Sequence, residues 1–289
     1  MARSWLSLGV ALAARQRRRL RESEAAFIVL AAIAGLAAGL LTNVQSFSAH
    51  GMQQLLYGVT INRLSALGSI HHPWKLLALP FGGLAMVGLA ELFRRRKRTP
   101  VDVVEANALH GGRIPLPDNL VISSQTLVSN GAGASVGLEA AYAQMGGGVA
   151  SVLGQALKLR RNDLRTLVGA GAGAAVGAAF GAPLAGAFYA FEIVIGTYTP
   201  AAVAPVVVAA LAATFVSRAL GVSPYLIATT GDRVIMTSDY LVFACLGLLC
   251  AGIGVAIMRL VTSVESGVSK LPRLGRWRPV LGGFLLIPI

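Results

Sequence analysis

Residues 130–144 read NGAGASVGLEAAYAQ, and most of what can be said about this chain follows from them. The stretch is small, rich in glycine and uncharged except for Glu139. A carboxylate at membrane depth costs several kcal/mol unless it faces a pore, a partner or a proton. We therefore expect Glu139 to serve a function, and we keep open the alternative that it caps a helix or pairs with an arginine.

The glycines before Glu139 predict that a new helix begins there. Glycine interrupts helices, so Glu139 is expected in the first turn of a half-helix. That turn carries backbone N–H groups without intrahelical partners and the positive end of the helix dipole. Such an end attracts anions, and an ionisable carboxylate beside it would compete with a bound anion.

The composition indicates an integral membrane protein with several spans. Of the 289 residues, 55% are hydrophobic and 13% are charged, whereas soluble domains carry roughly 25% charged residues. The net charge of +13 comes from clusters that flank apolar runs, which is typical of cytoplasmic anchors facing anionic headgroups. No soluble domain presents a basic face, so a nucleic-acid partner is not expected. The clusters are Arg15 to Arg21, Arg94 to Arg98, Lys158 to Arg165, and Lys270 to Arg278.

Two long apolar runs open the chain. The first predicts a helix from Glu24 to about Phe47, and the second runs from about Trp74 to Phe93. Residues 1–23 are predicted to be a basic cytoplasmic tail, because the apolar run after them is long and lacks a clear cleavage site. Basic clusters bracket the two spans and place both clusters on the cytoplasmic side. The loop between the spans is expected to hold His50, Asn62, Arg63, His71 and His72.

The middle of the chain has short, interrupted apolar runs. Residues 101–109 predict a short helix that Gly111 and Gly112 end. The next runs are near or below the roughly 20 residues needed to cross a bilayer, which indicates discontinuous helices around a buried ion or substrate site. These runs are 120–128, 139–157, 164–180 and 183–195, and longer or later runs follow at 200–220, 240–264 and 280–289.

Four glycines recur at intervals of four residues and predict a helix face that packs closely on another helix. No strand precedes them and no P-loop Lys-Ser/Thr follows, so they do not form a nucleotide loop. The four are Gly169, Gly173, Gly177 and Gly181.

The side chains that catalysis or metal binding would need do not form a recognisable set. Asp102, Glu105 and His110 are interpreted as interfacial residues, because no catalytic or metal motif surrounds them. Cys245 and Cys250 lie in an apolar run without metal-ligand spacing. We therefore expect no enzyme activity, no metal and no cofactor.

Two blocks of the sequence resemble a known membrane family. Residues 131–147, GAGASVGLEAAYAQMGG, are similar to the signature G-x-G-x-x-x-G-R/K-E-G-P-x-x-Q-x-G of the CLC chloride channels and proton/chloride antiporters. Residues 179–192, AFGAPLAGAFYAFE, resemble the A-F-N-A-P-L-A-G-x-x-F-x-x-E block of that family. The spacing of the blocks fits as well, and the resemblance covers about residues 24–289.

The resemblance implies an all-α polytopic membrane protein with the CLC-type inverted-repeat fold and its discontinuous half-helices. Residues 24–289 would form this transmembrane domain, with the first repeat and the start of the second. The second repeat has its own G-x-F-x-P-type motif and pore tyrosine, which have no counterpart before Ile289, so we expect the domain to be incomplete at its C-terminus. The family forms homodimers in which each subunit has its own pore, and a homodimer is expected here.

The resemblance also implies roles for the residues around Glu139. Glu139 matches the gating glutamate, whose carboxylate occupies an anion site and swings away or becomes protonated to let chloride pass. The backbone at the start of the half-helix would bind the anion. This backbone comprises Gly137, Leu138, Ala140, Ala141 and Tyr142.

Several positions depart from the family pattern. Leu138 replaces the usual basic residue, and Ala140 with Ala141 replaces Gly-Pro, but neither change removes a backbone N–H group. The first anion motif of the family, G-S-G-I-P, is degraded, because its nearest counterpart ends in Thr99 and Pro100 and keeps only a threonine hydroxyl.

The second block bears on coupling to protons. Glu192 matches the glutamate that closes the block, but Ile193 stands where antiporters carry a proton-transfer glutamate. We therefore expect a voltage- or pH-gated channel for chloride or a similar small anion, in the inner membrane, with passive conduction favoured over proton-coupled exchange. The alternative is a non-conducting truncated fragment, or a half-transporter that needs a second chain.

Overall fold

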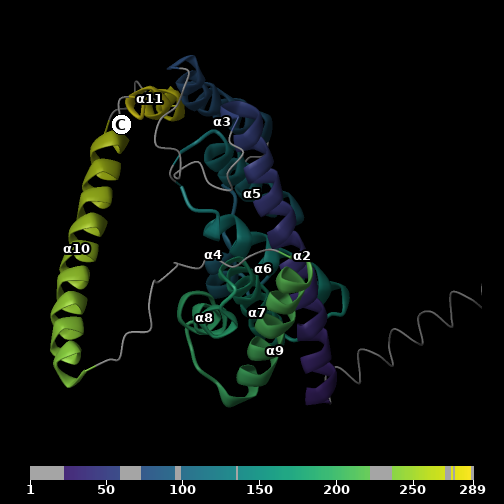
Figure 1. The fold of residues 1–289 in the computed structure, drawn as a ribbon. Helices are drawn as coiled ribbons and strands as arrows, with labels where there is room; N and C mark the ends of the chain where they lie inside the picture. The colour runs from purple at the N-terminus through teal and green to yellow at the C-terminus, as the bar shows by residue number, and fades with distance from the viewer. Residues whose placement is uncertain are drawn as a thin grey trace, which may run out of the picture. The chain divides into compact units, whose positions relative to one another are not determined.

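The structure is a computed structural model that describes residues 23–58, 73–94, 99–134, 136–221, 236–270, 275 and 277–287. Its regular elements, over these ranges, are all helical (Figure 1). The chain divides into two compact units, of which the first comprises Met1–Tyr225 with Pro279–Ile289 and the second Leu226–Arg278. All of the site residues predicted from the sequence belong to the first unit.

Helix α2, Glu24–Tyr57, is ten residues longer than the predicted helix that ended at Phe47. Ser23 caps its start by accepting a hydrogen bond from the Ala26 N–H at 3.4 Å. It ends at Gly58, whose left-handed φ of 69° suits glycine. The prediction failed because the residues after Phe47 are partly polar, a pattern typical of a loop. In the fold, Gln53 and Tyr57 donate hydrogen bonds to the carbonyls of Asn130 and Ala132. His50 is therefore a helical residue, while Asn62, Arg63, His71 and His72 lie outside the described residues.

The next two helices agree closely with the predicted runs. A short 3-10 turn, Pro73–Leu77, leads into α3, Ala78–Arg94. Helix α4 is Val103–Leu109, and Gly111 and Gly112 follow it with positive φ of 63° and 81°. Helix α5, Leu116–Gly131, begins four residues before the predicted run 120–128 and ends three residues after it, with Pro117 in its first turn, where proline is tolerated.

Helices α6, Glu139–Ala156, and α7, Arg161–Phe180, pack antiparallel along a seam of small residues. A side chain at Gly146 would overlap the Gly171 carbonyl, and a side chain at Gly171 would lie 2.5 Å from the Gly146 carbonyl. The two backbones thus touch directly, which only glycine allows. Farther along, Gly154 packs against Leu164 near the turn between the helices.

The predicted glycine stripe packs α7 against the segment that follows it. That segment is α8, Pro183–Tyr189, continued by a π-helix, Ala190–Ile195. Gly169 meets the Ile195 side chain, and Gly173 and Gly177 meet the backbone of α8 around Gly186. The fourth member, Gly181, instead ends α7 with a left-handed φ of 65°.

Helix α9, Pro200–Ala219, runs parallel to α2, and the two lie side by side (Figure 1). A Cβ on Gly39 would lie 2.6 Å from the Ala213 carbonyl oxygen. One turn on, the Asn43 amide donates to the Ser217 hydroxyl at 3.0 Å. In the second turn of α7, Arg165 donates to the carbonyl of Ile195 at 3.4 Å, and Ile195 lies five residues before α9 begins. The basic cluster 158–165 therefore lies at the same end as the starts of α2 and α9.

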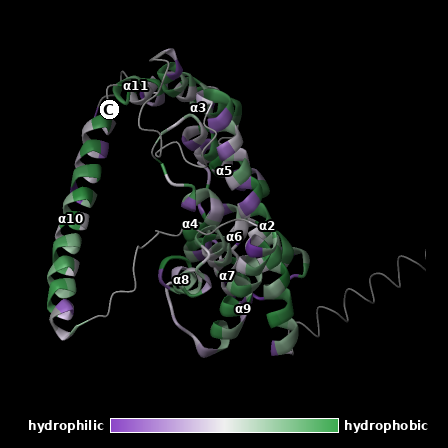
Figure 2. Cartoon of the chain, in the orientation of Figure 1, coloured by the Kyte–Doolittle hydropathy of each residue, from purple (hydrophilic) through white to green (hydrophobic). Residues whose placement is uncertain are grey.

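Within the part of the chain that the structure describes, four helices are long and apolar enough to cross a membrane, namely Glu24–Tyr57, Trp74–Phe93, Pro200–Ala219 and Asp239–Ser269 (Figure 2). Helix α11, Arg278–Leu285, packs on α3, where Gly83 meets Pro279 and Gly283 meets Leu79. The chain is thus a multi-pass membrane protein.

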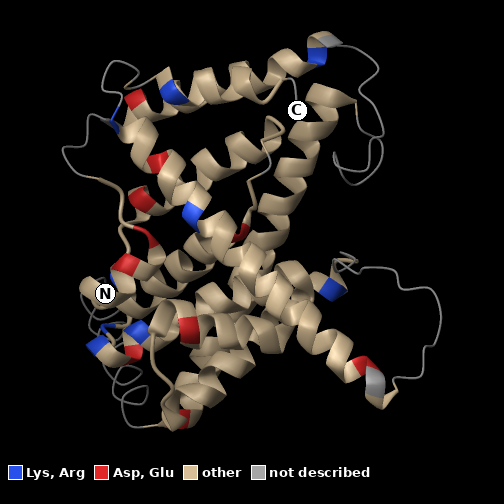
Figure 3. Ribbon diagram, turned by 90° about the vertical axis from the view of Figure 1, so that its left-hand side faces the viewer, with Lys and Arg blue, Asp and Glu red and all other residues tan. Residues whose placement is uncertain are grey.

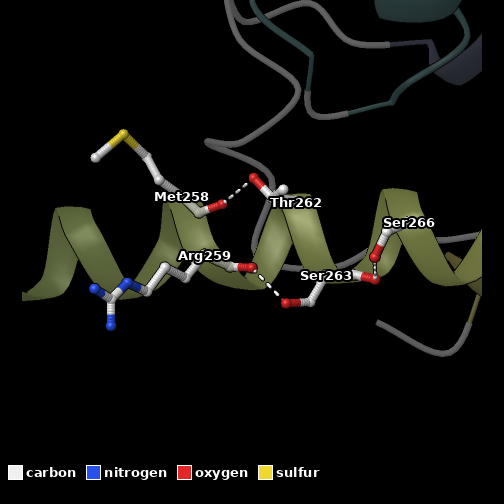
Figure 4. Close-up of a pocket in the computed structure, with 5 residues that line it drawn as sticks. All are labelled: Met258, Arg259, Thr262, Ser263 and Ser266. Carbon is white, nitrogen blue, oxygen red and sulfur yellow. Dashed lines mark hydrogen bonds between the residues drawn. The ribbon is translucent and has the colours of Figure 1, made fainter.

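Helix α10, Thr237–Ser269, makes up most of the second unit. Cys245 and Cys250 are free and exposed on it. The hydroxyls of Thr262 and Ser263 bond back to carbonyls of the same helix, at 2.9 and 2.8 Å. Figure 4 shows the shallow groove on one face of this single helix, lined by Met258, Arg259, Thr262, Ser263 and Ser266.

Candidate functional site

The loop between α5 and α6 prepares the start of α6. Its backbone turns at Gly133, where φ is 97°, a value that favours glycine. The Asn130 amide reaches over the loop and donates to the carbonyl of Val136 at 2.6 Å. As the glycines of the quoted stretch predict, the preceding helix is interrupted and Glu139 is the first residue of a new helix.

Helix α2 holds this loop from the side through polar side chains. Gln53 donates to the Asn130 carbonyl at 3.1 Å, and the Tyr57 hydroxyl donates to the Ala132 carbonyl at 2.6 Å. Nearer the middle of α2, the Gln45 amide lies 3.5 Å from the Ala141 carbonyl. These three polar residues are separated by eight and four positions, so they lie on one face of the helix. This periodicity would have predicted that the helix continues past Phe47.

Removal of the Tyr57 hydroxyl is expected to loosen the loop that leads to Glu139. In Tyr57→Phe the buried Ala132 carbonyl loses its donor, at a cost of about 1 kcal/mol in unfolding free energy. Thermal unfolding in detergent and amide hydrogen exchange over residues 131–138 would measure both effects. Tyr240→Phe, at an exposed tyrosine of α10, is the control, and equal exchange in both variants would contradict the bracing role.

Glu139 lies at the N-terminus of α6 and is exposed in this chain. Its carboxylate folds back over Gly137, because a Cβ built on Gly137 would overlap Glu139 Oε2. The preceding Leu138 is the N-cap residue and makes no side-chain cap. The Tyr142 N–H already donates to the Leu138 carbonyl at 2.9 Å. Of the predicted anion-binding amides, those of Ala140 and Ala141 therefore precede the first intrahelical bond, whereas that of Tyr142 is engaged.

The start of α4 is fastened beside α6. The Val101 N–H donates to Asp118 Oδ2 at 3.3 Å, and the Gln144 amide lies 3.5 Å from the Val101 carbonyl. A side chain at Gly147 of α6 would lie 2.5 Å from Val103. The cap of α4 is Asp102, whose Oδ1 accepts from the Glu105 N–H at 2.7 Å.

This cap changes the interpretation of the degraded first anion motif. Thr99 and Pro100 are exposed and precede the cap by three and two residues. The carboxylate of Asp102 instead caps the N-terminus of α4. The Thr99 hydroxyl is thus not the group that caps this helix.

Tyr189 packs against residues near the starts of both α4 and α6. It packs against the apolar cluster that contains Val103 of α4 and Ala143 of α6. It also interacts electrostatically with Asp102 and Glu139. Sequence reasoning missed Tyr189 because a tyrosine in an apolar block looks like packing, and only the fold brings it near two carboxylates.

Glu192 and Ile193 lie in the π-helical segment beyond Tyr189. Glu192 Oε1 accepts a hydrogen bond from the Tyr198 hydroxyl at 2.8 Å. The Tyr198 ring stacks on Phe191 with centroids 5.0 Å apart. Ile193 is half exposed, and its side chain has no group that can bind or release a proton. Short π-helical segments often occur at functional sites, so this segment remains a candidate part of the pathway.

The hydrogen bond to Glu192 raises the pKa of Tyr198 above its ordinary value, and the negative charge of the carboxylate adds to the shift. We expect the ultraviolet titration difference between wild type and Tyr198→Phe to have its midpoint above that of free tyrosine, and Glu192→Gln to lower it. Because the folded pKa is raised, the contact stabilises the fold below the unfolded pKa and is lost as pH rises through the folded pKa. An unchanged midpoint in Glu192→Gln would contradict this coupling.

The charged side chains are sparse along the long helices (Figure 3). Over the described ranges, no group of three or more His, Cys, Asp or Glu residues is placed to hold a metal ion. The titratable groups around the start of α6 are therefore the carboxylates of Glu139 and Asp102 with the hydroxyls of Tyr142 and Tyr189.

Comparison with known proteins agrees with this geometry. Residues 82–289 match the family model described as voltage gated chloride channel. The chain belongs to this family. Over 224 residues it is 34% identical to a chloride/fluoride channel protein of Pseudomonas syringae pv. tomato, covering 74% of this chain and 48% of that protein. Over 220 residues it is 28% identical to the voltage-gated ClC-type chloride channel ClcB of Escherichia coli, covering 74% of this chain and 52% of ClcB.

A solved structure extends the match to the fold. The crystal structure of a slow cyanobacterial Cl⁻/H⁺ antiporter superposes with a TM-score of 0.72 at 25% identity, covering 90% of this chain and 62% of the antiporter chain. The predicted all-α polytopic CLC fold is thereby confirmed. The chain spans about half the length of the curated relatives that it matches.

Proposed function

We propose that this chain forms an anion pathway for chloride or a similar small anion, with Glu139 as its gate. The observation that carries the proposal is the position of Glu139 at the start of α6, in a chain of the voltage gated chloride channel family. The amides of Ala140 and Ala141 with the helix dipole attract an anion there, and Gly137 and Leu138 supply the backbone before them. The Glu139 carboxylate competes for the same place.

Passive conduction is the mode we favour, because Ile193 supplies no proton-transfer group. Proton-coupled exchange is the second candidate, since the structural neighbour is a Cl⁻/H⁺ antiporter and Asp102 with Tyr189 adds titratable groups near Glu139. No covalent step is involved in either mode, so we propose transport and not enzymatic catalysis, and neither mode requires a metal or cofactor.

The two modes separate in one experiment. Liposomes containing this chain and an outward chloride gradient would be followed with a chloride electrode and an internal pH dye. Conduction predicts chloride release that stops without a potassium ionophore and moves no protons. Exchange predicts proton uptake driven by the chloride gradient. Repeating the assay with fluoride tests the anion, because one relative is named a chloride/fluoride channel protein.

The topology we propose follows the positive-inside rule. The basic cluster 158–165 lies at the end where α2 and α9 begin, so residues 1–23 would be a cytoplasmic tail and residues 24–289 the transmembrane domain in the cell's inner membrane. We further propose a homodimer, by likeness to the family. Labelling of single cysteines from outside intact cells would test the orientation.

The proposal has an alternative in which this chain conducts only together with a second chain that supplies the rest of the pathway. The chain spans about half the length of the matched relatives. Chloride release that appears only when a second chain is co-reconstituted would support this alternative. Release from the purified chain alone would exclude it.

A further inference from the structure

Three buried polar atoms lie in the contact between α5 and α6. They are the amide oxygens of Asn119 and Gln144 and the hydroxyl oxygen of Ser123, whose side chains are 2%, 1% and 6% exposed. Within the part of the chain that the structure describes, none of these three atoms has a hydrogen-bond partner. A buried polar atom without a partner destabilises a fold, and native structures rarely leave one unpaired. Each of the three atoms therefore needs a ligand.

The orientation of both amides follows from neighbours that can only accept a hydrogen bond. The Asn119 nitrogen donates to the Met145 sulfur at 3.3 Å, and the Gln144 nitrogen donates to the Val101 carbonyl oxygen at 3.5 Å. Neither a thioether nor a carbonyl has a hydrogen to donate, so each amide turns its nitrogen to that side. The atoms left over are two oxygens, which accept, and the Ser123 hydroxyl, which can donate.

A closed ring of contacts holds the two amides close to each other. The Val101 carbonyl is bonded to Gln144, and the Val101 N–H donates to Asp118 Oδ2 at 3.3 Å. Asp118 directly precedes Asn119 in the chain. Asn119 closes the ring through its bond to Met145, the residue after Gln144. The ring therefore confines both amide oxygens to one region between the start of α4, α5 and α6.

Ser123 belongs to the same region because α5 and α6 run antiparallel. The loop 132–138 joins them, and the start of α5 lies beside the later part of α6. A Cβ on Gly148 of α6 would lie 2.6 Å from Asn119 Oδ1, so these two positions oppose each other. One turn nearer the loop, Ser123 follows Asn119 on α5 and Gln144 precedes Gly148 on α6. Ser123 and Gln144 therefore face each other as the next pair.

We propose that a water molecule is bound between Asn119, Ser123 and Gln144 and bridges α5 to α6. The water donates its two hydrogens to the two amide oxygens, and its own oxygen accepts the hydrogen of the Ser123 hydroxyl. Buried waters typically make about three hydrogen bonds to groups that otherwise have no partner. A bridging water holds two groups nearly as well as a direct bond does. Gln144 lies five residues after Glu139, so this water helps to position the first turns of α6.

The first test uses the sign of a change in stability, measured on the full chain in detergent. With water bound, Ser123→Ala removes one of its three partners and should lower the midpoint temperature of unfolding by roughly 2–4 °C. If the hydroxyl had no partner, the same change would remove a buried unpaired group and raise the midpoint. An unchanged or higher midpoint would therefore overturn the site.

The matched control is Ser124→Ala, the same chemical change at the next position of α5. The Ser124 hydroxyl donates to the Val121 carbonyl of its own helix at 3.0 Å, so it needs no water. This variant should shift the midpoint by less than Ser123→Ala does. Equal shifts in the two variants would mean that the loss is a general effect of removing a hydroxyl from α5, and would overturn the site.

The second test observes the water itself, by solid-state NMR of the chain in lipid bilayers. The side-chain amide protons of Asn119 and Gln144 should each show a cross peak to a long-lived water. Asn43 is the control, because it is buried and its amide nitrogen donates to the Gly39 carbonyl at 2.9 Å and to Ser217 Oγ at 3.0 Å. It should show no such cross peak. A cross peak missing from either Asn119 or Gln144 would overturn the bridge.

A comparison of salts separates water from a cation at the same oxygens. Water predicts that the unfolding midpoint is the same in sodium chloride and in choline chloride of equal concentration. A midpoint that rises with sodium in the wild type, but not in Ser123→Ala, would assign the three atoms to a cation and overturn the water. None of these measurements needs anion flux, so the result is independent of the gating role of Glu139.

Discussion

Liposomes containing Glu139→Gln are expected to release chloride at the same rate at neutral and acid pH, whereas wild-type release should rise as the pH falls. Glutamine has the shape of a protonated glutamate and no negative charge, so it cannot compete with the anion at the start of α6. If the open form is the minor state of the wild type at neutral pH, the closed state limits the rate of chloride release. Glu139→Gln removes this limit and should raise the rate by roughly tenfold or more. The chloride electrode assay measures this directly.

The matched control is Glu105→Gln, which neutralises an exposed carboxylate in the first turn of the neighbouring helix α4. The two variants change the net charge equally, so a general electrostatic effect on anion entry would appear in both. Retained pH dependence in Glu139→Gln would remove Glu139 from the gate. Equal loss in both variants would assign the pH response to surface charge.

The start of α6 could be predicted from the sequence because its signal is local. Glycines before a single charge, inside an apolar stretch, indicate a helix start whatever surrounds them. The structure places that start at Glu139. The same holds for α9, which begins at Pro200 as predicted, since proline fits the first turn of a helix.

Features that depend on distant partners could not be predicted in this way. The extension of α2 to Tyr57 rests on bonds from Gln53 and Tyr57 to a loop some 75 residues later in the chain. Hydropathy registers these side chains only as polar. Tyr189 likewise gains its place near two carboxylates from the packing of α4, α6 and α8, which no local pattern encodes.

Gly39→Ala is expected to destabilise the first unit strongly, although alanine favours helices. The added Cβ would lie 2.6 Å from the Ala213 carbonyl oxygen and 2.8 Å from its Cα, so α2 and α9 would have to move apart. Backbone atoms cannot rotate away as a side chain can, and overpacking of this kind costs typically about 1–3 kcal/mol. Separation would also weaken the bond between Asn43 and Ser217 one turn farther on. Thermal unfolding in detergent would show the loss.

Gly51→Ala makes the same chemical change in the same helix, at a position where a Cβ would meet nothing within 4 Å. Here only the helix preference acts, so stability should stay unchanged or rise by roughly 0.5–1 kcal/mol. Opposite signs for the two variants would mean that direct backbone contact holds α2 to α9, as small residues do between membrane helices. Similar stability in both would mean that the helices separate without cost, and the close seam beside the Glu139 site would then not be what positions α2.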